Sequence, residues 1–289
     1  MSGRKLKKAG ARAIAQSLQE YGRGLAGGLM LSLPLLYTME VWWAGFIAHP
    51  WRLLAYVVAT FVLLLGYNRY GGLRRDASMA EVAIDSVEEM GIGLIVSAAA
   101  LFLLGRITFG MPFSEIAGQI VVEAMTVAIG VSVGTAQLGG DEEDEGLAGA
   151  SGQSADEKGI HFGGQMVLAL CGAVLFAANV APTEEIVMIA IEISWVRLLG
   201  LALLSLLLVS LILHYSEFTG ARQFVRTDSF GVILLGTIVT YAVALFASAL
   251  ILLFFGRFDQ VTLYTAVAQT IVLGVAASLG ASAGRLLLQ

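Results

Sequence analysis

The sequence predicts an all-α membrane protein with about eight transmembrane helices, arranged as two parallel four-helix repeats. Hydrophobic residues make up 57% of the 289 residues and charged residues only 13%, against roughly 25% charged in an average soluble domain. The apolar residues form long runs such as 195–213, and a bilayer core needs about 20 apolar residues per helix. The two halves of the chain also align with each other.

The predicted spans are separated by short breaks and by one long linker. His49-Pro50 and residues 109–112 predict tight hairpins at the first and third connections. Residues 138–162 are rich in Gly, Ser, Asp and Glu, which is typical of a disordered segment. The spans are expected at 24–47, 51–68, 85–105, 112–136, 163–183, 195–214, 229–255 and 261–284.

These spans divide the chain into four parts. The parts are a basic cytoplasmic segment (1–22), the first repeat (23–137), the acidic cytoplasmic linker (138–162) and the second repeat (163–289). With the N-terminus in the cytoplasm, thirteen of the 17 lysines and arginines fall on the inside. Cytoplasmic segments are enriched in these residues, so both termini are predicted to be cytoplasmic. The four arginines left at the outer ends are Arg52, Arg106, Arg197 and Arg257.

The internal alignment keeps polar residues in register. A shift of 145 residues lays 33–54 over 178–199 without a gap, and later segments match at a shift of about 150. Four spans per half is an even number, so the halves should share one orientation and be related by an axis along the membrane normal. The matched pairs include Thr38 with Thr183, Glu40 with Glu185, Arg52 with Arg197, Gly105 with Gly256, Arg106 with Arg257, Gln119 with Gln269, Gly130 with Gly280, Ser132 with Ser282 and Gly134 with Gly284.

Glu123 is the strongest single candidate for chemistry. It falls near the middle of the fourth predicted span, where a carboxylate costs several kcal/mol or more, and its repeat counterpart is Leu273. Desolvation there favours the neutral carboxyl, which could exchange a proton or hold a cation. The alternative is a neutral glutamic acid that hydrogen-bonds a neighbouring helix.

A second group of candidates recurs in both halves. Glu40 and Glu185 each follow a threonine by two positions, Thr38 and Thr183, and Glu184 adjoins the second glutamate. Pro182 predicts a kink there, and a broken helix frees carbonyls that could coordinate a cation together with these side chains.

The outer arginines offer a structural alternative for these glutamates. Arg52 and Arg197 each follow the repeated glutamate by 12 residues, across a tight hairpin, so a Glu–Arg bridge could simply hold each hairpin. The four outer arginines could also form an anion entrance or gate, but snorkelling from helix ends explains them more simply.

An acidic stripe marks the start of the third span. Glu81, Asp85, Glu88 and Glu89 follow the i, i+4, i+7, i+8 spacing of one helical face. Such a stripe could line a water-filled vestibule that concentrates cations at an inner mouth. Alternatively, it could form ordinary ion pairs. The candidate partners are Arg74, Arg75, Arg222 and Arg226.

Two short strings carry a family resemblance. LPLLYTMEVWW (33–43) and APTEEI (181–186) resemble segments of a family of uncharacterised bacterial integral membrane proteins, known only as a domain of unknown function. The similarity runs through most of the chain. It implies a multi-pass protein of the bacterial inner membrane and implies no activity.

The leading hypothesis is an ion-translocating protein, a cation or proton-coupled transporter or channel. Acids at three depths would form its path: Glu123 in the centre, Glu40 and Glu185 outside, and Asp85, Glu88 and Glu89 inside, with Gln119 and Gln269 as further pathway residues. We expect no catalytic site, because the spans lack paired catalytic side chains, and no cofactor or nucleic acid. Cys171 allows no internal disulfide.

The alternative is a non-transporting membrane scaffold or sensor. Its acidic loop at 141–157 would bind a basic partner in the cytoplasm, and the chain could also form homo-oligomers.

Overall fold

The described part of the chain is helical throughout. The structure, a computed structural model, describes residues 19, 21–72, 77–137, 162–215 and 230–287, and no β-strand occurs in these ranges. The linker predicted over 138–162 lies outside them except for Phe162, as does most of the basic segment 1–22. After a first helix, Tyr21–Leu36, come α2 (Met39–Ile47), α3 (Pro50–Tyr70), α4 (Met79–Leu103), α5 (Phe113–Gln137), α6 (Phe162–Ala178), α7 (Glu184–Glu192), α8 (Trp195–Tyr215), α10 (Phe230–Phe254) and α11 (Leu263–Leu287).

The helices fit a multi-pass membrane protein. Among the described residues, six helices are long and apolar enough to cross a bilayer, and the first helix with α2 makes a seventh if that bent pair is one span. Helix α6 is apolar but has 17 residues, which rise about 25 Å against a hydrocarbon core of about 30 Å.

Two of the predicted spans are broken rather than continuous. The span expected at 24–47 ends as a helix at Leu36, and α2 then leaves at 85° to it. Thr38 is extended at the break, with φ −96° and ψ 114°. The span expected at 163–183 ends at Ala178, and Pro182 separates it from α7. Continuous hydrophobicity hides the first break, because α2 is apolar as well.

Helices on the two sides of the linker correspond in order and length. Helices α2 and α7 both have 9 residues, α3 and α8 both have 21, and α4, α5, α10 and α11 all have 25. The turns after α4 and α10 also match, because Gly105 and Gly256 take positive φ angles of 67° and 69°.

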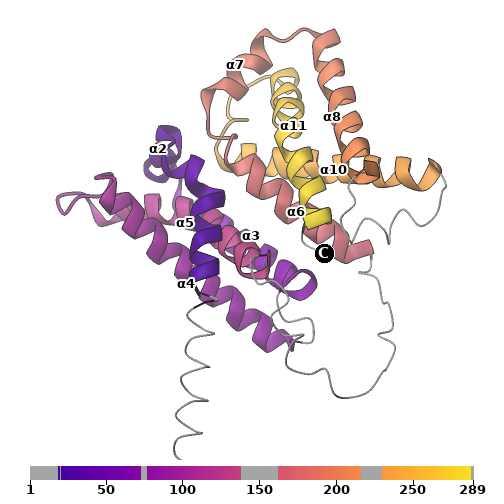
Figure 1. The fold of residues 1–289 in the computed structure, drawn as a ribbon. Coiled ribbons are helices and arrows are strands. Elements are labelled where there is room, and N and C mark those ends of the chain that lie inside the picture. The colour runs from indigo at the N-terminus through magenta and orange to yellow at the C-terminus, as the bar shows by residue number, and fades with distance from the viewer. Residues whose placement is uncertain (1–18, 20, 73–76, 138–161, 216–229, 288–289) are drawn as a thin grey trace, which may run out of the picture.

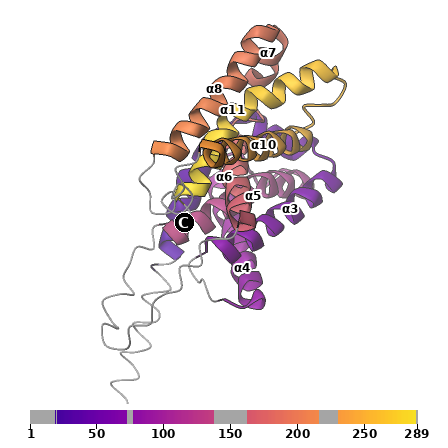
Figure 2. The same ribbon diagram turned by 90° about the vertical axis from the view of Figure 1, so that its right-hand side faces the viewer.

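Helices α5 and α11 are central, because each contacts at least four other helices. Helix α11 contacts α6, α7, α8 and α10, and α5 contacts α2, α3, α4 and α6. Figure 1 shows the chain up to α5, in indigo and magenta, on one side and the later helices, in orange and yellow, on the other. The turned view in Figure 2 keeps α8, α11 and α10 side by side. The outer helices expose Leu, Ile, Val and Phe, as a lipid-facing surface requires.

Glycine contacts draw the central helices together. Gly27 of the first helix lies against Gly130 and Gly134 of α5. Gly172 of α6 lies against Gly280 and Gly284 of α11 in the same way. Small residues allow backbones to approach closely inside a membrane, where hydrophobic burial alone gives little attraction between helices.

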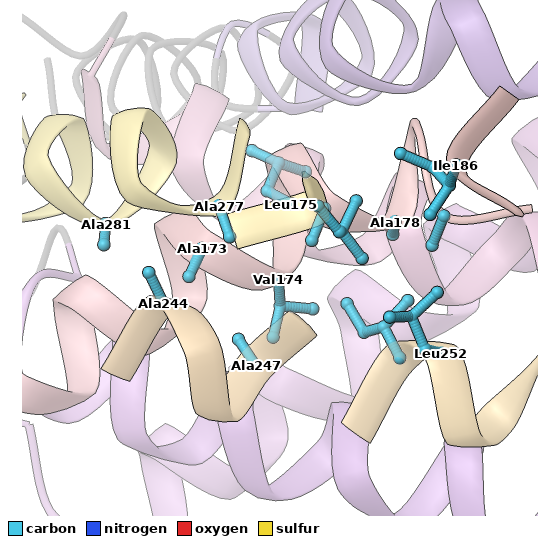
Figure 3. Close-up of a cluster of buried hydrophobic side chains, with 14 of the residues drawn as sticks. Ala173, Val174, Leu175, Ala178, Ile186, Ala244, Ala247, Leu252, Ala277 and Ala281 are labelled. Atoms are coloured by element: carbon cyan, nitrogen blue, oxygen red, sulfur yellow. The ribbon is translucent and has the colours of Figure 1, made fainter. Parts of the chain in front are cut away.

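A cluster of buried apolar side chains fills the space between α6, α7, α10 and α11. Figure 3 shows Ala173 and Val174 of α6 facing Ala244 and Ala247 of α10, with Ala277 and Ala281 of α11 beside them and Ala178 next to Ile186 of α7. The same cluster includes Leu64, Ala128 and Ile129 from α3 and α5, so it also joins the two groups of helices.

We expect Gly172→Ala to destabilise the protein, because its Cβ would overlap the carbonyl oxygen of Gly280. Overpacking of this kind costs about 1–3 kcal/mol in unfolding free energy. Gly200→Ala in α8 is the matched control, since no atom lies within 4 Å of its added Cβ. The free energies of unfolding of both variants in mixed micelles measure the effect. Equal stability of the two variants would contradict close packing of Gly172 against Gly280.

Candidate functional site

A cavity of about 350 Å³ lies between α3, α4, α5 and the start of the first helix. All four acids of the predicted stripe line it, together with polar and apolar residues of the neighbouring helices. Because Glu81, Asp85, Glu88 and Glu89 follow one face of α4, a single helix presents all four to the same space. The other lining residues are Tyr21, Asn68, Gly72, Ile84, Ile92, Val131, Ser132, Thr135 and Ala136.

Asn68 of α3 organises the buried end of this cavity. Its amide nitrogen donates to Glu89 Oε2 at 2.8 Å and to Ser86 Oγ at 3.1 Å. Its amide oxygen accepts from Ser132 Oγ at 2.8 Å. Asn68 and Glu89 are only 8% and 9% exposed. One side chain therefore connects α3, α4 and α5 through hydrogen bonds that a buried carboxylate requires.

The remaining acids of the stripe differ in environment. Glu81 takes part in a capping box, since its carboxylate accepts from the backbone N–H of Ser78 at 2.7 Å. Glu81 and Glu88 are exposed and Asp85 is half-buried. The arginines named as alternative partners, Arg74, Arg75, Arg222 and Arg226, lie outside the described residues.

Glu123 is buried in the middle of α5, as predicted, and is separate from the cavity. It is 0% exposed, and neither carboxylate oxygen has a hydrogen-bond partner among the described residues. Gln119, one turn away and 2% exposed, has an unpartnered Oε1 in the same part of the chain. Nine residues separate Glu123 from Ser132, which places the two on opposite faces of α5 about 14 Å apart along its axis.

The position of Glu123 follows from how the first helix crosses α5. Gly28 lies against Val127, and the two helices run in opposite directions. Ser32 lies one turn after Gly28 and Glu123 one turn before Val127, so these two residues lie at the same level of the antiparallel pair. Both side chains are 0% exposed. Glu123 therefore faces the end of the first helix, near its break at Leu36.

The residues that align with Gln119 and Glu123 in the internal sequence comparison, Gln269 and Leu273, lie in different environments. Gln269 is 0% exposed, with both amide atoms unpartnered among the described residues, whereas Leu273 is part of the apolar cluster. Arg285 is only 5% exposed and donates to Gln165 Oε1 at 3.1 Å, to Gly236 O at 3.2 Å and to Thr240 Oγ1.

The sequence alone predicts no role for Asn68, and it predicts for Arg285 only a place among the basic residues on the cytoplasmic side. The only signal for either was a lone polar residue close to a predicted span end.

The repeated Thr-x-Glu residues lie at the starts of α2 and α7. Glu40 is half-buried in the first turn of α2, and Glu184 and Glu185 are exposed in the first turn of α7. Acids at this end of a helix interact favourably with its dipole. The hydroxyls of Thr38 and Thr183 donate to the carbonyls of Pro34 and Val180. In the described ranges, no group of three His, Cys, Asp or Glu residues could hold a metal ion.

Three of the four outer arginines have separate partners, and the fourth is exposed. Arg52 forms an ion pair with Asp259 at 2.9 Å, and so does not bridge to Glu40. Arg106 lies 4.6 Å from the Trp42 ring centroid and donates to Leu104 O. Arg257 donates to Pro182 O, and Arg197 is exposed.

Replacing Asn68 with leucine should destabilise the protein by about 1–3 kcal/mol, because Glu89 and Ser132 would lose a buried partner. Adding Glu89→Met should recover part of that loss, since an apolar side chain needs no partner. Unfolding free energies of both single variants and the double variant in mixed micelles give the coupling. Purely additive effects would show that Asn68 does not support Glu89.

Comparison with known proteins places the chain in one family. A family profile described as "Putative integral membrane protein (DUF2391)" matches residues 20–288, so the chain belongs to this family of unknown function. Searches of curated proteins and of solved structures found no match.

Proposed function

We propose that this integral membrane protein moves cations or protons across a bilayer by means of intramembrane carboxylates. The observation that carries the proposal is the cavity at one end of α4, whose buried end holds the carboxylate of Glu89. A buried carboxylate that is hydrogen-bonded and also borders an open space can bind and release a cation. Inner-membrane location and cytoplasmic termini belong to the same proposal.

The frame we propose is a pair of parallel repeats related by an axis along the membrane normal. The equal lengths of α2 and α7, α3 and α8, α4 and α10, and α5 and α11 support it. The glycine contacts support it independently, because Gly27 and Gly134 correspond to Gly172 and Gly284 at the shifts found in the sequence. In this frame, each half has three full-length spans and one broken span.

Alternating access fits the arrangement better than an open channel. The cavity ends at Ile92 and Val131, and neither Glu123 nor Gln119 lines it. An ion that leaves Glu89 for Glu123 must pass to the opposite face of α5, which requires the surrounding helices to move. Movement of one parallel repeat against the other is a known transporter mechanism, and here it would act on a site that lies within the first half.

The outer contacts between the halves are suited to such movement. Arg52 and Asp259 are 41% and 57% exposed, so their ion pair contributes about 0–1 kcal/mol and breaks easily. Tyr56 of α3 stacks on Phe254 of α10 with ring centroids 4.2 Å apart. We propose that these two contacts close the outer side of the interface.

Glu89→Gln and Glu123→Gln should each reduce cation or proton flux into liposomes at least tenfold, because each removes an ionisable carboxyl group that the path requires. Glu115→Gln is the matched control, since Glu115 lies on α5 but does not line the cavity. Fluorescent dyes for protons, sodium and potassium measure the flux. No movement of any of these ions, with both variants equal to the parent, would refute transport and favour the scaffold reading.

Cross-linking the outer contact should stop flux reversibly. In a Cys171→Ser background, Arg52→Cys and Asp259→Cys introduce a pair of thiols that a membrane-impermeable, reducible bifunctional reagent can join. We expect flux to fall at least fivefold and to recover on reduction, with either single cysteine variant unaffected. Unchanged flux after complete cross-linking would contradict movement at this interface.

A further inference from the structure

The second half of the protein contains its own cation at the place where the first half has the cavity. The shifts of 150 and 151 residues make Thr135 equivalent to Arg285, Glu89 to Thr240 and Asp85 to Gly236. The Arg285 guanidinium is buried and hydrogen-bonds the side chain of Thr240 and the carbonyl of Gly236. In the first half, all three equivalent residues line the cavity.

At these three pairs of positions, the side chains of the first half are chemically complementary to the guanidinium of the second half. A long cationic side chain is replaced by the short Thr135, and the neutral Thr240 and Gly236 are replaced by the acids Glu89 and Asp85. The first half thus provides acceptors where the second half provides the donor. A guanidinium has a planar set of N–H donors that matches carboxylate oxygens in paired hydrogen bonds.

We infer that the cavity binds a small organic cation with a guanidinium head group, in the position that the Arg285 side chain occupies in the second half. Its volume of about 350 Å³ falls within the range of small-molecule sites, about 300–1,000 Å³. Ile84, Ile92 and Val131 give it an apolar wall for a short alkyl tail. The inference rests on the repeats proposed above and deepens the proposed function by naming its substrate class.

Binding of butylguanidinium to the full-length protein in nanodiscs, measured by calorimetry, tests this inference. Butylguanidinium should bind at least tenfold tighter than butylammonium, which has the same tail and charge but lacks the planar donors. Glu89→Gln and Asp85→Asn should each weaken binding at least tenfold. Equal binding of the two ligands, or no binding at all, would overturn the inference.

A variant that carries its own guanidinium group in the cavity gives the most direct test. Thr135→Arg should abolish butylguanidinium binding, because it supplies the first half with the side chain that the second half has. Gln137→Arg is the control, since it adds the same charge two residues away at an exposed position outside the cavity lining. Undiminished binding to a folded Thr135→Arg variant would overturn the inference. If that variant does not fold, butylguanidinium binding to the isosteric Glu89→Gln variant decides, and undiminished binding there would overturn the inference.

Binding and flux separate this inference from the proposed function. Flux of protons or inorganic cations without butylguanidinium binding would overturn the inference and leave transport standing. Binding without flux of any ion, butylguanidinium included, would support the inference and refute transport.

Discussion

The need to satisfy every backbone polar group inside hydrocarbon governs this structure. Helices α3, α4, α8 and α10 meet it with unbroken internal hydrogen bonding over 21 or 25 residues each. The breaks between the first helix and α2 and between α6 and α7 leave carbonyl groups without helical partners, and side chains donate hydrogen bonds to them. Thr38 and Trp42 donate to carbonyls before the first break, and Thr183 and Arg257 donate to those of the second. This use explains Arg257 without an anion entrance.

Close contact between backbones is the second requirement, and it determines the position of Glu123. The glycines of the first helix hold it against α5, which brings the helix break next to the buried Glu123 and Gln119. The same contact of α6 with α11 surrounds Leu273 with alanine, valine and leucine instead. Similar frames thus enclose a carboxylate in one half and an apolar core in the other, so the differences in chemistry come from side chains rather than from backbone.

Much of the fold could be predicted from the sequence, because length and hydrophobicity determine which segments span a membrane. The predicted spans from 51–68 to 112–136 agree with α3, α4 and α5 to within several residues. The break before α2 could not be predicted, since an apolar helix continues after it. Helical spacing was enough to place the acidic stripe on one face. Asn68 could not be found, because its importance depends on Glu89 and Ser132, which are distant in sequence and meet it only in the folded chain.

The 85° bend between the first helix and α2 has a consequence for the lipid. If the first helix stands near the bilayer normal, α2 lies almost in the plane of the membrane, with Trp43, Phe46 and Ile47 exposed. Aromatic side chains favour the headgroup layer, so α2 would fix the depth of its half. A bilayer of different thickness would then have to adjust around the protein, because tilting would force α2 out of the interface.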